Sequence, residues 1–162
     1  MGKIVIVGSG PAGCSAALYA ARAGQEVVVI SMGMGALSKA ELIQNYYGFE
    51  EGITGAELYR QGVAGAKAVG AEFITAEVVG LDYTGSLVVQ TTEGDYPADA
   101  VILATGAGRI APKIAGLAEH EGRGVSYCAT CDAFFYRGKT AAVLGSGEYA
   151  LHEVQALLPL AG

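Results

Sequence analysis

The sequence predicts an α/β protein built on a parallel sheet, and two observations support this fold class. A β-branched strand, a glycine-rich loop and a helical stretch follow one another at the start of the chain, and the same order recurs after residue 139. The first strand shows no alternation of apolar and polar residues, which is typical of a parallel strand buried on both faces. The 162 residues, 52% of them hydrophobic, are ample for one domain with a buried core.

The composition excludes several classes of function. A net charge of −6 without any cluster of Lys or Arg argues against nucleic acid or an anionic membrane surface as a partner. Every apolar run is broken well before the roughly 18 residues that a membrane span needs. No signal peptide is visible at the start. Three cysteines fit a reducing compartment, so we expect a cytoplasmic protein.

The first strand, residues 3–7, leads into a loop with the pattern G-x-G-x-x-G and then into a helix over 14–23. The loop consists of Gly8, Ser9, Gly10, Pro11, Ala12 and Gly13. Its first glycine permits a tight turn, the second lets the backbone approach a pyrophosphate, and the third lets the helix pack on the strand. The helix N-terminus favours negative charge. We therefore predict a dinucleotide site; the alternative is a strand, turn and helix without a ligand.

The second strand, 26–30, ends at Ser31, where a ribose-binding acid commonly stands. A hydroxyl can still hydrogen-bond to ribose, but the adenosine end loses a strong acceptor. A loop over 32–39 follows, and after it come Tyr46, Tyr47 and Phe49. These rings would either form the wall of a site for a flat ring system or fill the core under the loop.

The middle of the chain predicts a helix over 54–69, with Thr54 as its N-cap, and then three strands. The strands are expected at 72–82, 87–92 and 100–104, with turns at Gly85 and at Gly94-Asp95. We interpret them as an antiparallel excursion and not as further β-α-β units. The small residues Ala104, Thr105 and Gly106 would let a loop lie against a nucleotide. Pro112 and the glycine-rich stretch 116–124 indicate a linker or hinge.

A Cys-x-x-Cys motif, Cys128 to Cys131, has Asp132 directly beside its second sulfur. Such a pair can close a readily exchanged disulfide: one thiolate attacks a partner's disulfide, and the neighbour resolves the mixed disulfide. The glycine-rich loops on either side of the motif favour this redox interpretation.

Half of a zinc site is the alternative for the cysteine pair. Zinc prefers four ligands, and only Cys14, His120 and His152 remain as soft candidates, so we predict no metal site. We expect Cys14 to be a small core residue and His152 to be a surface group on the last helix.

A second glycine-rich loop follows a strand predicted over 140–144 and precedes a helix predicted over 149–158. The loop begins with Gly145, Ser146 and Gly147, and it fits the looser pattern that ends in Ala. Two such beginnings suggest two dinucleotides. A chain of 162 residues is too short to complete both sheets.

Together these motifs resemble the N-terminal half of the low-molecular-weight, flavin-containing thioredoxin reductases, over the whole chain. The motifs that carry the resemblance are Gly8 to Gly13, Ala104-Thr105-Gly106, Gly122-Arg123-Gly124-Val125, Cys128-Ala129-Thr130-Cys131-Asp132 and Gly145-Ser146-Gly147. The resemblance implies a Rossmann-like, three-layer FAD/NAD(P)-binding fold with a β-meander, followed by the start of an inserted nucleotide-binding domain. The implied boundaries are 1–111 for the FAD-binding domain, 112–124 for the linker and 125–162 for the redox domain.

The resemblance also implies a role for each site residue. Cys131 would face the flavin and take its electrons, Cys128 would attack a thioredoxin-like protein disulfide, and Asp132 would serve as acid and base. FAD would be bound by the first glycine-rich loop and by Ser31, Met32, Asn45, Val79, Ala104, Thr105 and Gly106. The second loop, Gly145 to Gly147, would take NADPH, and a homodimer is expected.

Two departures from the family pattern concern the electron donor. Gly35-Ala36-Leu37-Ser38 replaces the family's Gly-Gly-Gln-Leu, and Tyr47 takes the place of a proline. Both changes are similar to the ferredoxin-dependent branch, which takes electrons from an iron-sulfur protein. The second glycine-rich loop is nevertheless intact, so the sequence leaves NADPH, NADH and ferredoxin open as donors.

The family's last third, which returns to the flavin domain, is not among the 162 residues. We therefore expect a piece of a longer protein, and we expect this piece alone to hold FAD poorly. Two other functions fit the same motifs: a flavin dithiol oxidase that passes electrons to oxygen, and a non-catalytic FAD- or zinc-binding fragment.

Overall fold

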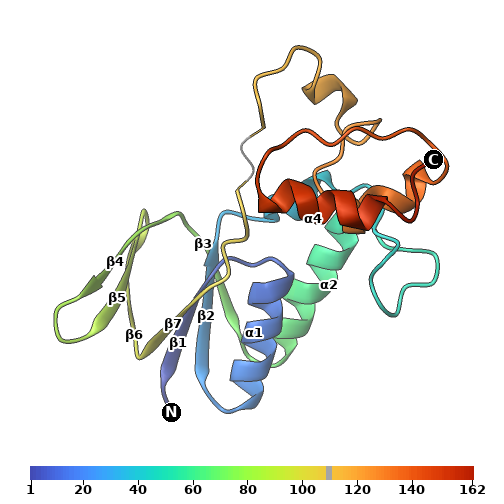
Figure 1. Cartoon of the computed structure of the whole chain (residues 1–162). Helices are drawn as coiled ribbons and strands as arrows, with labels where there is room; N and C mark the ends of the chain where they lie inside the picture. Colours follow the sequence, from blue (N-terminus) through green and yellow to red (C-terminus); the bar gives the residue numbers. More distant parts are fainter. Residues whose placement is uncertain (109–110) are drawn as a thin grey trace. The chain divides into compact units, whose positions relative to one another are not determined.

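Figure 1 shows a computed structural model of the chain, in which residues 1–108 and 111–162 are described. Residues 109 and 110, which the predicted first domain included, lie outside the described part. The described residues form two compact units, one ending at Gly108 and one covering 111–162. Each unit has its own architecture.

A parallel sheet with two helices on one face organises the first unit, as the sequence predicts (Figure 1). Its four strands are β1 (Lys3–Val7), β2 (Glu26–Ser31), β3 (Glu72–Thr75) and β7 (Ala100–Leu103), in the order β3-β2-β1-β7. The helices are α1 (Pro11–Arg22) and α2 (Gly55–Ala68). All three strand pairings are parallel, so every strand of this sheet ends at the same edge as the first glycine-rich loop.

The core lies on both faces of this sheet, which explains the unbroken apolar runs of β1 and β2. On one face, Ile6 and Val29 pack against Ala17 of α1 and Ala66 of α2. On the other face, Val5, Val7, Val28 and Ile30 pack with Val89 of the antiparallel strand β5. Successive side chains of a strand point to opposite faces, so each strand contributes to both clusters.

The second face is covered by a three-stranded antiparallel sheet, β4-β5-β6, which completes the predicted three layers. Its strands are β4 (Val78–Tyr83), β5 (Leu87–Thr91) and β6 (Gly94–Ala98). The antiparallel prediction was wrong for β3 and β7, which are parallel strands of the main sheet. The predicted strand 72–82 is in fact two strands, because the chain leaves one sheet and enters the other at Ala76 and Glu77.

Strand β6 lies where the sequence predicted only a turn at Gly94-Asp95. Gly, Asp and Pro are depleted in strands, and this one contains Gly94, Asp95 and Pro97. An edge strand tolerates them, and β6 pairs only with β5, with Pro97 opposite Val88.

Helix α1 begins three residues earlier than predicted, at Pro11. Proline is favoured at the first helical position because its missing N–H has no partner there and its φ is already helical. The last three residues of the glycine-rich loop therefore form the first turn of α1. In the predicted loop over 32–39, residues Gly35–Lys39 form the 3-10 helix η1.

The regular elements described in the second unit are short helices joined by long irregular segments. It contains η2 (Ala118–His120), α3 (Ala129–Asp132), η3 (Ala133–Tyr136) and α4 (Glu148–Leu157). The strand predicted over 140–144 was wrong for this structure, since those residues have no strand partner among the described residues. The neighbouring backbone groups of Gly138 and Lys139 instead hydrogen-bond to Leu160 and Gly162. No described helix is both long and apolar enough to cross a membrane.

Candidate functional site

The first glycine-rich loop lies between β1 and α1, in close contact with the residues that follow β7. Gly8 has φ of +107°, and a Cβ there would lie 2.3 Å from the carbonyl oxygen of Ala104. A Cβ on Gly13 would lie 1.9 Å from the carbonyl oxygen of Gly8. By contrast, a Cβ on Gly10 would meet nothing within 4 Å. Two of the glycines thus allow close packing within the protein, whereas the third leaves open space at the helix N-terminus.

The hydroxyl of Ser9 is the centre of a polar cluster at the end of β2. Ser9 is 1% exposed, and its Oγ lies 2.7 Å from the Ser31 Oγ and 3.1 Å from the Tyr59 hydroxyl. It also donates to the carbonyl oxygen of Gly33 over 3.2 Å. The structure thus joins two predicted site residues, Ser9 and Ser31. The contribution of Tyr59 from α2 was missed, because a tyrosine on an amphipathic helix carries no sequence signal for this contact.

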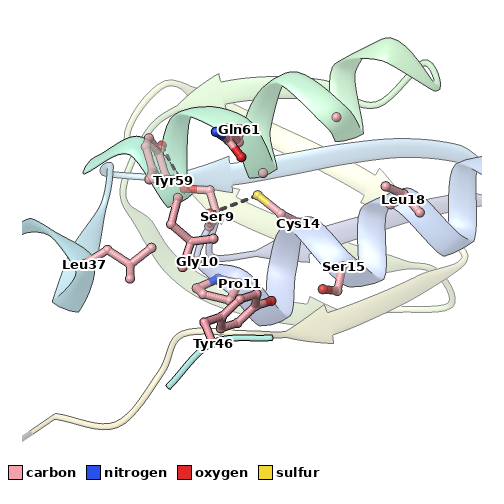
Figure 2. Close-up of a pocket in the computed structure, with 13 residues that line it drawn as sticks. Ser9, Gly10, Pro11, Cys14, Ser15, Leu18, Leu37, Tyr46, Tyr59 and Gln61 are labelled. Carbon is pink, nitrogen blue, oxygen red and sulfur yellow. Dashed lines mark hydrogen bonds between the residues drawn. The ribbon is translucent and has the colours of Figure 1, made fainter. Parts of the chain in front are cut away.

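A pocket of about 150 Å³ opens beside this loop (Figure 2). It is lined by Ser9, Gly10, Pro11, Cys14, Ser15, Leu18, Leu37, Tyr46, Leu58, Tyr59, Gln61, Gly62 and Gly65. In the described structure no side chain caps the N-terminus of α1, and its first turn contains no acidic residue. Its backbone N–H groups therefore suit an anion such as a pyrophosphate, so the residues present fit a dinucleotide.

Cys14, in the wall of this pocket, is a core residue, as predicted. It is 6% exposed, and its Sγ donates a hydrogen bond to the carbonyl oxygen of Ser9 over 3.1 Å. Burial raises the pKa of the Cys14 thiol because the thiolate is poorly solvated there.

The remaining residues predicted for FAD lie in different surroundings. Thr105 and Gly106 follow β7, at the same sheet edge as the loop. Met32 lies in the turn after β2, 70% exposed, and Asn45 lies in an exposed loop. Val79 lies on β4 and is 64% exposed. The structure does not bring these last three residues into the lining of the pocket.

The aromatic residues after η1 form an exposed loop. The rings of Tyr46 and Phe49 lie 6.1 Å apart, and Tyr46 reaches the pocket. Tyr47 is 99% exposed, so the alternative that these rings fill the core under the loop does not hold for it.

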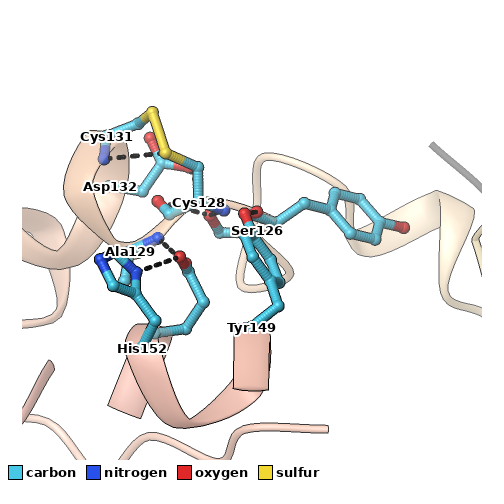
Figure 3. The surroundings of a disulfide bond; sticks show 9 residues. Ser126, Cys128, Ala129, Cys131, Asp132, Tyr149 and His152 are labelled. Carbon is cyan, nitrogen blue, oxygen red and sulfur yellow. Dashed lines mark hydrogen bonds and ion pairs between the residues drawn. A yellow bond between two sulfur atoms is a disulfide. The ribbon is translucent and has the colours of Figure 1, made fainter. Parts of the chain in front are cut away.

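Cys128 and Cys131 form a disulfide in the second unit (Figure 3). Cys128 precedes the short helix α3, and its Sγ accepts a hydrogen bond from the backbone N–H of Cys131 over 3.2 Å. Cys131 is exposed, and Cys128 is partly buried. The bridge is therefore open to a redox partner on the side of Cys131.

The carboxylate of Asp132 is held beside the disulfide by Ser126. The Ser126 hydroxyl lies 2.5 Å from the Asp132 Oδ2, and the same hydroxyl accepts the backbone N–H of Cys128 over 3.1 Å. The Ser126 hydroxyl thus hydrogen-bonds both to Asp132, the predicted acid and base, and to the backbone of Cys128, the predicted nucleophile. The position of Ser126, two residues before Cys128, gave no sequence signal for this role.

Helix α4 contacts the disulfide segment with two further side chains. Glu153 accepts a hydrogen bond from the backbone N–H of Ala129, and the Tyr149 hydroxyl donates to the carbonyl oxygen of Tyr127 over 3.1 Å. His152, predicted as a surface group, is 68% exposed and lies 3.5 Å from the Glu153 carboxylate.

The second glycine-rich loop, Gly145 to Gly147, lines a pocket of about 170 Å³ with residues of α4. Helix α4 differs from α1 because its first turn contains an acid, Glu148. A carboxylate at this position would repel a phosphate, so this loop fits a dinucleotide less well than the first loop does. Among residues 1–108 and 111–162, no three His, Cys, Asp or Glu side chains gather as a metal site would require.

Comparisons with known proteins give one consistent family. The model of the pyridine nucleotide-disulphide oxidoreductase family matches residues 2–160. A bifunctional thioredoxin reductase/thioredoxin of Mycobacterium leprae is 46% identical over 93% of this chain and 34% of its own length. A thioredoxin reductase of Streptomyces coelicolor is 40% identical over 93% of this chain and 48% of its own.

A solved structure gives the same result. The thioredoxin reductase of Streptococcus pyogenes is 37% identical and superposes with a TM-score of 0.87, over 98% of this chain and 52% of that one. The chain thus spans between about a third and a half of the length of the proteins that it matches.

Proposed function

The chain belongs to the pyridine nucleotide-disulphide oxidoreductase family, and from this premise we propose that its protein is a flavin-dependent thioredoxin-disulfide reductase. The observation that carries the proposal is the Cys128–Cys131 disulfide with the Asp132 carboxylate held beside it. A bridge between cysteines three positions apart, exposed on one side, suits thiol–disulfide exchange better than a structural staple.

In this proposal the first unit binds FAD, which supplies two electrons to the disulfide when it is bound and reduced. The N-terminus of α1 and the open space at Gly10 receive the pyrophosphate. The hydroxyl of Ser31, oriented by Ser9, takes the place of the usual ribose-binding acid. Asn45, Met32 and Val79 remain proposed contacts, supported by their place in the sequence pattern.

The dithiol then transfers the two electrons to a protein disulfide. The Cys128 thiolate attacks one sulfur of the partner's disulfide, so that a mixed disulfide forms and the other partner sulfur leaves as a thiolate. The Cys131 thiolate attacks the Cys128 sulfur, which restores the internal disulfide and releases the second partner sulfur. Asp132, oriented by Ser126, takes the proton of the attacking thiol and passes it to a leaving thiolate.

The second glycine-rich loop is proposed to accept the nicotinamide donor, although Glu148 weakens its fit for phosphate. Reduction of the full-length protein by NADPH, NADH and reduced ferredoxin, followed by stopped-flow absorbance, separates the donors. If Glu148→Gln tightens NADPH binding several-fold, repulsion between the Glu148 carboxylate and the phosphate limits the affinity of the unmodified protein for NADPH. If ferredoxin is the only donor that reduces the protein, the proposal that the second glycine-rich loop binds a nicotinamide donor is wrong. We also propose a cytoplasmic location, which the small number of cysteines supports, and a homodimer, which gel filtration of the full-length protein tests.

The activity is tested with oxidised thioredoxin and the full-length protein, with Cys128→Ser, Cys131→Ser and, as a control, Thr130→Ser. We expect each cysteine variant to lose turnover by at least about 1,000-fold, as for removal of a nucleophile that acts as part of a unit. Thr130→Ser should retain it. Full turnover without both sulfurs would refute the proposal. Oxygen consumption with a small dithiol, without use of a donor, would instead identify an oxidase.

A further inference from the structure

Two side chains of α4 hydrogen-bond to the peptide groups on either side of Cys128. Tyr149 donates to the carbonyl oxygen of Tyr127, the residue before the cysteine, and Glu153 accepts the N–H of Ala129, the residue after it (Figure 3). Positions 149 and 153 are four residues apart, so both side chains lie on one face of the helix. Cys128 is thus held from both sides by a single element.

We propose that Tyr149 and Glu153 are positioning residues for the dithiol, and that the Glu153 carboxylate also makes the dithiol a stronger reductant. This inference rests on the proposed function and assigns a role to two residues outside its reaction steps. Tyr149 and Glu153 fix the backbone on both sides of the attacking sulfur, so that its direction is set before a partner arrives.

The environment of Glu153 supports a role for its charge. Its side chain is 13% exposed, and its two oxygens accept the Ala129 N–H and lie beside the His152 imidazole. His152 is 68% exposed, so solvent screens its influence. The Glu153 carboxylate accepts the N–H of the residue that follows Cys128, so its negative charge is held near the peptide group of the attacking cysteine. Like charges disfavour the thiolate, so Glu153 shifts the equilibrium towards the disulfide.

The test measures the equilibrium of the full-length protein with glutathione, in which the disulfide and two glutathione thiols give the dithiol and glutathione disulfide. Acid-quenched samples are resolved by reversed-phase chromatography. Glu153→Gln keeps an acceptor oxygen but removes the charge, and it should raise the constant for reduction about fivefold, or about 20 mV. Glu153→Asp keeps the charge but shortens the reach to the Ala129 N–H, so it should change the constant less than about twofold but lower kcat with thioredoxin.

Tyr149→Phe and a matched control complete the set. Tyr149→Phe should leave the glutathione equilibrium within about twofold but lower kcat with thioredoxin about fivefold at unchanged KM, which corresponds to one lost hydrogen bond. Glu119→Gln removes an exposed charge of the same unit, on η2, and among the described residues its side chain has no hydrogen bond to the disulfide segment. It should shift the equilibrium by less than about twofold.

If Glu153→Gln stays within twofold of the unmodified protein in the glutathione equilibrium, the charge role is overturned. If Tyr149→Phe and Glu153→Asp retain full kcat, the positioning role is overturned. A purely structural role would lower the unfolding temperature without the predicted shift in equilibrium. If Glu153→Gln shifts the equilibrium but thioredoxin is not a substrate, the proposed function fails and this inference stands.

Discussion

At the scale of single residues, Glu57 shows how local hydrogen bonds lower the pKa of a carboxyl group. Its backbone N–H donates to the Thr54 side chain at the start of α2, and its carboxylate accepts from Arg60 and Gln61. The hydrogen bond from Arg60, then that from Gln61, lowers the pKa of Glu57 to about 2. Hydrogen bonds to the charged form favour it, so the group stays ionised in weak acid.

The first prediction concerns this pKa. Its folded value lies below its unfolded value, so ionised Glu57 stabilises the fold above the ordinary pKa of 4.5, and this stability is lost as the pH falls towards 2. Because the group is exposed, the contribution to stability is small. Arg60→Ala should return the pKa towards 4.5, as measured by NMR titration of the carboxyl carbon, and Gln61→Ala should do so less. An unchanged pKa in Arg60→Ala would contradict the assigned cause.

At the scale of elements, the loop between β1 and α1 contains different glycines for packing and for binding. Gly13 lies where the backbone of the preceding loop leaves no room for a side chain, whereas Gly10 faces open space. The same loop therefore contains one glycine required by the fold and one that the fold does not require. The glycine pattern of the sequence predicts the same two roles, since its second glycine is expected to serve the pyrophosphate and its third to serve packing.

The second prediction uses this pair of glycines. Gly13→Ala should destabilise the full-length protein by about 3 kcal/mol, because a methyl group would overlap the Gly8 carbonyl. Gly10→Ala, at an N-cap position, should cost only about 1 kcal/mol or less but weaken FAD binding at least about tenfold. Denaturant unfolding and flavin fluorescence titration measure the two effects. Equal stability losses in both variants would contradict the separation.

The elements also show how far sequence reasoning extends. The spacing of apolar residues and the turn residues in the sequence predicted the bounds of β1, α1, β2, α2 and α4 to within a few residues. They failed where pairing decides the structure: β6 contains Gly and Pro yet forms at an edge, and the apolar segment 140–144 finds no neighbouring strand within residues 1–108 and 111–162. A strand is stabilised by its partners, so its own residues cannot establish it alone.

At the scale of the whole molecule, the candidate sites were predictable only in part. The loop residues and Cys128, Cys131 and Asp132 come from local motifs. Tyr59 and Glu153 reach their sites from other helices, and their contacts depend on how those helices pack. Such contacts between distant segments have no periodic signal in a single sequence.

The third prediction concerns cofactor retention. The pocket of about 150 Å³ is smaller than the roughly 300–1,000 Å³ typical of ligand sites, and the chain spans half or less of its relatives. The 162-residue chain should therefore lose FAD during gel filtration, as seen in its visible absorbance spectrum. One bound flavin per chain after the column would contradict this expectation.

Because Cys14 is buried, labelling of the unmodified sequence with a thiol-reactive dye reports the redox state of the Cys128–Cys131 bridge. That thiol is enclosed, and its raised pKa keeps it protonated near neutral pH, so a maleimide dye does not react with it in the folded state. The other two cysteines are bridged when oxidised and accessible to a dye once reduced. The number of dyes attached per chain therefore counts the electrons that the bridge has received, and no cysteine needs to be removed beforehand.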